Sequence, residues 1–365
     1  MSGGLGEPLL TDSEPVAAVP FRIGVLLVNL GTPDSPGACA VGAYLSEFLM
    51  DGRVIDIPWV LRACLVRCII SPFRRFRSSR EYRKVWTSEG SPLLVHTKNL
   101  AEKVARRMAA LSSPPGEGRR KQYSVHFAMR YGTPSMSSML DVMRKQAYDR
   151  VVVLPLYAQY ASATTGSTLD EAMKIIRQWY VIPDVRLVAQ YWDDEGYLEC
   201  FCNRARGFEV GDYDHVLFSY HGVPIRQVDK VYEDRRCANH SCDEEINAEN
   251  RFCYKATCYA TTRALVDRLG IENYTVCFQS RIGNKWLSPF TDKVVVNLAE
   301  NGHRRLLVFS PAFVADCLET TVEVGREYAE LFKKHGGDVL DLVPSLNSGD
   351  DWVEAVCGLV QSHSA

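Results

Sequence analysis

The sequence has no apolar run near the ~20 residues that a helix needs to cross a lipid bilayer. It also lacks an excess of either charge, because 42 lysines and arginines stand against 44 aspartates and glutamates, for a formal net charge of −2. This balance argues against a nucleic-acid partner. Residues 1–20 have neither a basic start nor a continuous apolar segment, so we expect a flexible tail and not a signal peptide.

Twelve cysteines are present, yet no secretion signal accompanies them. Disulfide frameworks belong to oxidising compartments, so these thiols are expected to stay reduced or to bind metal in the cytoplasm. Of the 365 residues, 46% are hydrophobic and 24% are charged. This ordinary globular chain is long enough for two domains of roughly 150 residues each.

Three segments of the first half recur in the second half, in the same order. The pairs are "VLLVNLGTP" (25–33) with "VLFSYHGVP" (216–224), "YSVHFAMRYG" (123–132) with "YTVCFQSRIG" (274–283), and "RVVVLPLYAQYASATT" (150–165) with "RLLVFSPAFVADCLETT" (305–321). A single match between apolar strands can arise by chance. Three matches in one order indicate a duplicated α/β unit.

The apolar runs in these segments are short, rich in Val, Leu and Phe, and do not alternate with polar residues. Such runs are typical of strands buried on both faces of a parallel sheet. Helical patterns lie between them, at 96–111 and 260–270. We therefore predict an α/β fold of two doubly wound domains related by duplication. They cover 21–190 and 191–345, and a C-terminal helix at 350–363 packs back on the first.

Three polar side chains come at the ends of predicted strands, namely Arg130, His221 and Ser310. In doubly wound sheets a ligand lies beyond the carboxyl ends of the strands, and the cleft between two domains is the natural place for it. We therefore expect His221 to lie beside a ligand.

The first half has about forty more residues than the second between its first two matched strands. Part of this surplus, at 57–86, mixes apolar side chains with arginines. They are Trp59, Leu61, Leu65, Ile69 and Ile70 with Arg62, Arg67, Arg74, Arg75 and Arg77. This mixture suits an interfacial helix on an anionic membrane surface. The alternative is a core helix followed by a basic loop.

Four cysteines lie close together in the second half, at Cys237, Cys242, Cys253 and Cys258. Their spacing is C-x4-C, ten residues, then C-x4-C, which brings two pairs together without long loop closure. Four thiolates suit a tetrahedral zinc ion or an iron–sulfur cluster. The alternative is a polar loop with incidental thiols.

An acidic stripe follows the third matched strand of the second half. Its members recur every three or four residues and so share one helical face: Asp316, Glu319, Glu323, Glu327 and Glu330. On an isolated surface helix such a stripe is only exposed charge. Here the helix begins at a strand end that faces the cleft, where crowded carboxylates bind a divalent cation or take up protons.

Seven ordered motifs resemble the ferrochelatase family, whose members insert ferrous iron into a porphyrin to make haem. They are "LLVNLGTPDSP", "YLSEFLMDGRVIDIP", "SPLL", "YASATTGST", "FSYHGVP", "FQSRIGNKWLSPFTD" and "FVADCLETTVEV". The resemblance extends from about Phe21 to Leu359. It implies two Rossmann-like domains, each with a four-stranded parallel sheet, that hold the porphyrin between them.

The resemblance also implies roles for single residues. The family's pivotal histidine corresponds to His221 and its pivotal glutamate to Glu319, and both would contact the Fe²⁺ substrate. The residues that correspond to a proton or metal path are Asp316, Glu323 and Glu327. The residues that correspond to the porphyrin pocket are Leu30, Arg130, Tyr131, Ser162, Thr164 and Trp286. The family's membrane-resting lip corresponds to the region 57–86.

These residue types suit the reaction. A free-base porphyrin must be bent, must lose two pyrrole protons and must receive Fe²⁺. Apolar and aromatic walls can bind the ring and hold it distorted, at the expense of binding energy. A neutral His221, which titrates near physiological pH, is the natural acceptor of a pyrrole proton. Arg130 is suited to a charge-assisted contact with a propionate.

The chain departs from the family pattern at three places. Relatives with an iron–sulfur cluster use a cysteine where Ser162 stands, together with a C-terminal extension that is missing here. We therefore predict that the insertion 237–258 binds a [2Fe–2S] cluster through its own four thiolates, with structural zinc as the alternative. Cys317 replaces a histidine of some relatives. Leu30 replaces a tyrosine of relatives that use coproporphyrin, which favours protoporphyrin IX as substrate over coproporphyrin III.

Two other functions stay open. A cobalt-inserting chelatase would commonly present a histidine from each half, whereas the second half here supplies Glu319. A non-catalytic haem-binding or redox-sensing module would not need both His221 and Glu319. The expected location is the cytoplasm, with peripheral contact to the inner face of the cell membrane. The sequence gives no oligomeric state.

Overall fold

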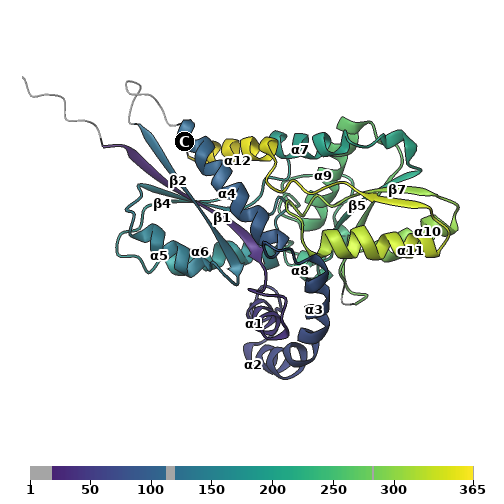
Figure 1. Ribbon diagram of the computed structural model, residues 1–365, viewed down its shortest axis with the longest axis horizontal. Coiled ribbons are helices and arrows are strands. Elements are labelled where there is room, and N and C mark those ends of the chain that lie inside the picture. The colour runs from purple at the N-terminus through teal and green to yellow at the C-terminus, as the bar shows by residue number, and fades with distance from the viewer. Residues whose placement is uncertain (1–18, 112–119, 282, 365) are drawn as a thin grey trace, which may run out of the picture.

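Two four-stranded parallel sheets lie side by side at the centre of the molecule (Figure 1). The computed structural model describes residues 19–111, 120–281 and 283–364, so nearly all of the predicted tail at 1–20 lies outside the described part. The first sheet has the order β2-β1-β3-β4, from β1 (Phe21–Gly31), β2 (Lys121–Tyr131), β3 (Arg150–Pro155) and β4 (Asp184–Leu187). The second has the order β6-β5-β7-β8, from β5 (His215–His221), β6 (Tyr274–Gln279), β7 (Arg305–Phe309) and β8 (Val339–Leu342).

The predicted duplication is visible in the strand order. The repeat pairs β1 with β5, β2 with β6 and β3 with β7, and each pair holds the same place in its sheet. In the second sheet, for example, Phe218 of β5 lies between Val276 of β6 and Phe309 of β7. The prediction of two α/β domains with parallel sheets is therefore confirmed.

Both sheets are buried on both faces, as their unbroken apolar runs predicted. Alternate residues of β1 and β5, including Val25 and Phe218, meet in one core that the two halves share. The other face of the first sheet packs on a core around Leu26 and Leu140, and that of the second on a core around Leu217 and Phe332. The shared core explains why the halves form one body.

Helices cover both faces of the two sheets. In the first half they are α1 (Ala38–Leu49), α4 (Pro92–Ala110), α5 (Met136–Arg144), the short π-helix η2 (Ser162–Gly166) and α6 (Ser167–Ile176). In the second half they are α7 (Glu195–Ala205), η3 (Val210–Asp212), α8 (Ile225–Asp229), η4 (Cys237–Asn239), α9 (Tyr254–Leu269), α10 (Thr291–Glu300), η5 (Glu319–Tyr328), α11 (Ala329–Lys334) and α12 (Asp350–Ser362).

The segment 57–86 forms a helical projection below the sheets in Figure 1. It consists of α2 (Trp59–Cys64), the π-helix η1 (Leu65–Ile70) and α3 (Ser71–Val85). Large apolar side chains stand in solvent here, and Phe73 is 76% and Trp59 61% exposed. The segment is therefore not a core helix followed by a loop; we call it the lip. Within the described residues, no helix is long and apolar enough to cross a membrane.

The C-terminal helix α12 joins the two halves on the side away from the lip (Figure 1). Lys103 and Arg107 of α4 pair with Asp350 and Glu354 of α12. The other side of α12 meets α7, where Arg204 forms a two-pronged ion pair with Asp351. This helix therefore fixes the halves against each other and leaves the lip side as the place where a cleft can open.

Candidate functional site

His221 is the last residue of β5 and lies half-buried at the carboxyl end of the second sheet. Its Nδ1 lies 2.7 Å from the carbonyl oxygen of Gly222. A carbonyl oxygen only accepts, so Nδ1 must carry the proton and donate it. In the neutral ring, Nε2 is therefore the nitrogen with the free lone pair.

Gly222 makes the close packing around His221 possible. A Cβ at this position would lie 2.8 Å from the carbonyl oxygen of Gln279 and 3.3 Å from the ring of Trp286. The backbone of Gly222 also donates to that carbonyl oxygen at 2.8 Å. Trp286 thereby lies against the residue that follows His221.

Gln279 connects His221 to the acidic helix, although the sequence did not single it out. It ends β6, where it pairs in register with His221 of β5. Its Nε2 donates to the carbonyl oxygen of Glu319 at 3.4 Å, and its Oε1 accepts from Ser219 at 2.6 Å. The buried amide of Gln279 thus fixes the first residue of η5 beside the strand end that carries His221.

Glu319 faces aromatic side chains of the first half. Burial raises the pKa of Tyr44 and of Tyr82, and the charge of Glu319 adds to the rise in both. Burial likewise raises the pKa of Cys317, with Glu319 as the next cause. Glu319 of the second half therefore lies within electrostatic reach of α1 and α3, across the boundary between the halves.

The acidic helix η5 is a π-helix, in which hydrogen bonds run from residue i to i+5. Residues four apart, such as Glu319, Glu323 and Glu327, therefore follow one another at about one turn. Glu323 accepts hydrogen bonds from the backbone of Ser280 at 2.9 Å, from the hydroxyl of Ser280, and from Tyr328 at 2.6 Å. These three donors hold the carboxylate of Glu323 in one orientation.

A pocket of about 320 Å³ opens beside Glu323. It lies at the end of β6 and is lined by Phe278, Gln279, Ser280, Arg281, Asp292, Glu323 and Tyr328. Gln279 belongs both to this pocket and to the contact with Glu319. The pocket therefore gives solvent a route to the middle of the acidic helix.

The two outer members of the predicted path have partners elsewhere. Burial raises the pKa of Glu327, and the nearby Glu81 of α3 raises it further. Asp316 accepts from the side-chain amide of Asn347 at 2.8 Å. It also faces His96 of α4, whose pKa is lowered by burial and raised in part by Asp316. His96 was not predicted, because its pattern in the sequence is that of an ordinary helical residue.

The guanidinium of Arg130 lies in a polar network inside the first half. Its Nη2 pairs with Asp51 at 2.6 Å, and its Nε donates to the hydroxyl of Ser167 at 2.8 Å. The hydroxyl of Tyr131 donates to Asp51 at 2.9 Å, and Tyr131 is only 1% exposed. Burial opposes ionisation of Asp51, but hydrogen bonds from Ser167 and Arg53 outweigh it and lower the pKa of this carboxyl. The network holds Arg130 rigidly at the end of β2.

The remaining predicted pocket residues lie at two strand ends of the first half. Leu30 is the penultimate residue of β1 and is partly exposed. Ser162 and Thr164 lie in η2, after β3. The guanidinium of Arg53 lies 3.4 Å from the hydroxyl of Ser162. These residues and the Arg130 network therefore share the carboxyl edge of the first sheet.

Ion pairs tie the start of the lip to the second half. Asp56 accepts from Arg226 at 2.9 Å and from Lys230 at 2.7 Å, next to α8. Gln227 of α8 donates to the carbonyl oxygens of Arg53 and Val54. Burial favours the protonated form of Asp56, but the two cations outweigh it and lower its pKa to about 2. We call these contacts the lip clasp.

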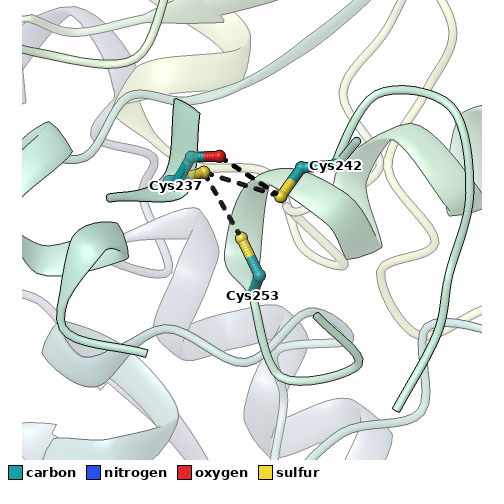
Figure 2. A group of neighbouring side chains, drawn as sticks. All are labelled: Cys237, Cys242 and Cys253. Carbon is teal, nitrogen blue, oxygen red and sulfur yellow. Dashed lines mark hydrogen bonds between the residues drawn. The ribbon is translucent and has the colours of Figure 1, made fainter. Parts of the chain in front are cut away.

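Three of the four predicted cysteine ligands converge (Figure 2). The sulfurs of Cys237, Cys242 and Cys253 all lie within 4.8 Å of one another, and the side chains are buried. The Cys237 sulfur is 3.6 Å from that of Cys242 and 3.9 Å from that of Cys253. Among the residues that the structure describes, this is the one group of three or more side chains spaced to hold a metal. We call it the three-cysteine group.

Cys258 lies outside the three-cysteine group. Cys253 caps the N-terminus of α9, and Cys258 comes five residues later on that helix. Five residues correspond to about 1.4 helical turns, so the two side chains point in different directions. Burial raises the pKa of Cys258 well above its usual range. The structure therefore brings together three of the four predicted ligands and leaves Cys258 apart from them.

The three-cysteine group has polar surroundings that suit a thiolate. Hydrogen bonds from Cys237 and Cys242 lower the pKa of the Cys253 thiol well below its usual value. Tyr232 lies with its hydroxyl 2.7 Å from the Cys242 sulfur, and His240 stacks on the ring of Tyr232. The pKa of Cys237 is raised by its hydrogen bonds to Cys242 and Cys253, and that of Cys242 is raised as well, so Cys253 is the thiol that ionises most readily. Converging buried cysteines are a donor set that zinc and iron bind.

Comparison with known proteins identifies the family. The family model described as Ferrochelatase matches residues 22–364. The chain belongs to the ferrochelatase family. Ferrochelatase from Legionella pneumophila (strain Corby) is 37% identical over 343 residues, which cover 93% of this chain and 99% of the relative. Ferrochelatase from Coxiella burnetii (strain Dugway 5J108-111) is 36% identical over 346 residues, which cover 93% of each chain.

A solved structure supports the fold. SirB from Bacillus subtilis with Fe³⁺ superimposes with a TM-score of 0.53 at 12% identity, over 94% of this chain and 96% of that one. At this identity the likeness concerns the fold alone. Family membership establishes the protein as a metal chelatase of haem biosynthesis, with a porphyrin and iron as its substrates.

Proposed function

We propose that this enzyme inserts Fe²⁺ into protoporphyrin IX to form protohaem, with His221 as the acceptor of a pyrrole proton. The observation that carries the proposal is the tautomer of His221. Its Nδ1 is committed to the carbonyl oxygen of Gly222, so its Nε2 keeps a free lone pair at the strand end. A positioned imidazole base is well suited to proton transfer.

Two protons must leave the porphyrin for each Fe²⁺ that enters, and His221 can take one at a time. Glu319, held beside the His221 strand by Gln279, is the next acceptor and a ligand for the incoming ion. From there Glu323 and Glu327 continue along η5 toward the pocket at the end of β6. Asp316 lies before Glu319 on the same segment and completes the path.

Porphyrin binding is assigned to the walls around this strand end. Trp286 offers a ring surface against Gly222, and Leu30 offers an apolar side chain from the equivalent strand of the first half. Ser162 and Thr164 contribute from η2, whereas the buried Tyr131 supports Arg130 from behind through Asp51. A ring held between such walls can be kept bent with binding energy from its periphery.

Leu30 supports protoporphyrin IX over coproporphyrin III as the substrate. The vinyl edges of protoporphyrin are apolar, whereas coproporphyrin carries two more propionates in their place. The test is the iron-dependent loss of fluorescence of each porphyrin under anaerobic conditions. We expect kcat/KM to be at least about tenfold higher for protoporphyrin IX, equivalent to about 1.4 kcal/mol. Equal values, or a preference for coproporphyrin III, would reject this substrate.

We further propose that the three-cysteine group holds a metal centre. A [2Fe–2S] cluster takes four cysteine ligands, so Cys258 or another donor must join the three convergent sulfurs. Zinc is also bound by three cysteines and a histidine, and His240 is nearby. Sulfur distances of 3.6 and 3.9 Å match the ~3.8 Å edge of a tetrahedron with metal–sulfur bonds of ~2.3 Å, which supports the zinc alternative.

Metal analysis and the visible spectrum decide between these two centres. About two non-substrate irons per chain, with bands that bleach on reduction by dithionite, would establish the [2Fe–2S] cluster. A colourless protein with about one zinc per chain would establish the zinc site. Replacement of Cys258 by Ser should abolish the cluster but leave zinc bound to the other three cysteines.

The lip supports the proposal that the protein lies in the cytoplasm and binds peripherally to an anionic membrane surface. Its exposed apolar side chains, Phe73 and Trp59 among them, adjoin arginines along α2 and α3. Apolar insertion and headgroup attraction both contribute to such binding. The test is co-sedimentation with vesicles of anionic or neutral lipid. We expect the protein to sediment with the anionic vesicles, and we expect Phe73→Asp to lose this binding. Recovery of the wild type in the supernatant to the same extent with both kinds of vesicle would contradict the proposed membrane contact.

A further inference from the structure

The three-cysteine group adjoins the backbone that carries His221. Cys253 is followed directly by Tyr254, the first residue of α9. The hydroxyl of Tyr254 donates to the carbonyl oxygen of His221 at 2.9 Å. Tyr254 is 7% exposed, so this hydrogen bond is shielded from water. The residue directly after Cys253 therefore holds the backbone of His221 through a hydrogen bond.

A second bond ties the group to the chain just after His221. The backbone N–H of Cys237 donates to Asp229 Oδ1 at 2.8 Å. Asp229 is the last residue of α8, and α8 begins four residues after His221. The same helix carries Arg226 of the lip clasp. The three-cysteine group thus contacts the helix that follows His221, and the residue next to Cys253 contacts the carbonyl oxygen of His221.

The segment that brings the cysteines together has little regular structure of its own. Residues 230–253, all of which the structure describes, contain one three-residue helix, η4, and no strand. Its backbone is held mainly by short-range turn hydrogen bonds, such as those from Asn239 to Arg236 and from Cys253 to Asn250. A metal ion that cross-links three thiolates would add a constraint of longer range, because metal binding and local folding are one equilibrium.

The peptide between His221 and Gly222 links the cysteine segment to the orientation of the His221 imidazole. Its carbonyl oxygen accepts from Tyr254, and the next carbonyl oxygen, of Gly222, accepts from Nδ1 of His221. Rotation of this short backbone unit would move the acceptor that orients the ring. The position of Tyr254, together with the hydrogen bond from the Gly222 N–H to Gln279, therefore determines where Nε2 of His221 points.

We propose that a metal centre at the three-cysteine group positions His221 for proton transfer through Tyr254. Tyr254 is a positioning residue, since it touches the backbone of His221 and not the substrate. The inference rests on the proposed function, in which His221 is the proton acceptor. It assigns the cysteine insertion a part in the reaction itself, in place of a purely local structural role.

The first experiment uses Tyr254→Phe in the metal-loaded protein. Loss of one buried hydrogen bond should lower kcat for iron insertion about 3- to 10-fold. We expect the KM for porphyrin and the metal content to stay as in the wild type. Tyr259→Phe is the matched control, because Tyr259 lies on the same helix and contacts Lys255. It should leave kcat within about twofold of the wild type.

The second experiment tests whether the metal acts through Tyr254. Metal is removed by chelation or by Cys242→Ser, in the wild-type and the Tyr254→Phe background. If the two changes act through one bond, their effects on kcat are not additive. Metal loss should then cost about tenfold in the wild type and less than about twofold in Tyr254→Phe.

A histidine NMR spectrum gives a readout that does not depend on turnover. The His221 imidazole signal is assigned by its absence in His221→Ala. Metal removal should shift this signal in the wild type and leave it in place in Tyr254→Phe. An unchanged His221 signal on metal loss, additive effects on kcat, or a wild type that binds neither zinc nor iron would each overturn the inference. A wild type that shows the NMR shift but inserts no iron would instead overturn the proposed function.

Discussion

The two halves share one topology but present different side chains at equivalent strand ends. In the gapless repeat, Leu30 of β1 corresponds to His221 of β5. Leu30 offers an apolar surface, whereas His221 offers a nitrogen lone pair fixed by Gly222. Duplication therefore supplies two matching edges, and in our proposal single residues at these edges divide porphyrin binding from proton transfer.

Each half also carries an insertion that the other lacks. The first half gains the lip, an exposed apolar projection, between its first two strands. The second half gains the three-cysteine group at the corresponding place, between β5 and β6. Both additions meet at α8, whose Arg226 binds Asp56 of the lip clasp and whose last residue, Asp229, accepts a hydrogen bond from Cys237. The halves are thus joined at the site by the parts that the duplication does not share.

Replacing each of the two equivalent residues, His221 and Leu30, by alanine tests the difference between the halves with the largest expected effect. His221→Ala should lower kcat about 10³-fold, because it removes the proton acceptor, with porphyrin affinity nearly unchanged. Leu30→Ala should weaken porphyrin binding about fivefold, through lost apolar contact, with kcat nearly unchanged. Fluorescence assays of binding and turnover measure both. Near-normal turnover of His221→Ala would remove the assignment of the two roles.

The acidic helix offers the next largest effect. Glu319→Gln should lower kcat about 10²-fold, since Glu319 accepts protons beside His221. Glu330→Gln, further along the same stretch, should change kcat less than about twofold. The ratio of the two losses is read from anaerobic turnover at saturating porphyrin and iron. Equal losses would mean that the stripe is surface charge and not a path.

Two equivalent arginines, Arg130 and Arg281, allow the halves to be compared by their contributions to the free energy of unfolding. Arg130 pairs with Asp51, whose side chain is 10% exposed, whereas its repeat partner Arg281 pairs with Asp292, whose side chain is 37% exposed. Arg130→Leu should lower the free energy of unfolding by about 3 kcal/mol, because it leaves a buried carboxylate unpaired. Arg281→Leu should cost about 1 kcal/mol or less. Urea unfolding at neutral pH compares them, and similar costs would contradict the difference in burial.

The lip clasp gives the smallest effect. Asp56→Asn should lower the free energy of unfolding by about 1 kcal/mol, for two partly exposed cations. Because the folded pKa of Asp56 is lowered to about 2, this contribution is complete above the unfolded value near 4 and disappears as the pH falls through 2. The difference between wild type and Asp56→Asn should therefore be the same at pH 5 and pH 7. A difference that grows between these pH values would contradict the assignment.

Much of the fold could be predicted from the sequence because its signals are local. Short Val-rich runs in repeated order, including those that end at Leu30 and His221, specify six parallel strands, and the structure confirms the two parallel sheets. The acidic stripe is also local, although η5 is a π-helix, a form that the spacing of Glu319 and Glu323 did not indicate.

Contacts between distant parts of the chain could not be predicted. Gln279 reaches Glu319, Asp51 holds Arg130, and Tyr254 reaches His221 only because the fold brings them together. No spacing in the sequence announces such pairs. The cysteine set is an intermediate case, because the helix predicted at 260–270 begins already at Tyr254 and so turns Cys258 away from Cys253.

The central claim is most directly tested by one anaerobic titration of wild-type protein with protoporphyrin IX and Fe²⁺. Our account predicts that porphyrin fluorescence is lost over many turnovers per enzyme, that protohaem is released, and that His221→Ala binds porphyrin without this loss. Fluorescence quenching that stops at one porphyrin per chain, with no protohaem released, would contradict it and would indicate a binding protein on the same scaffold.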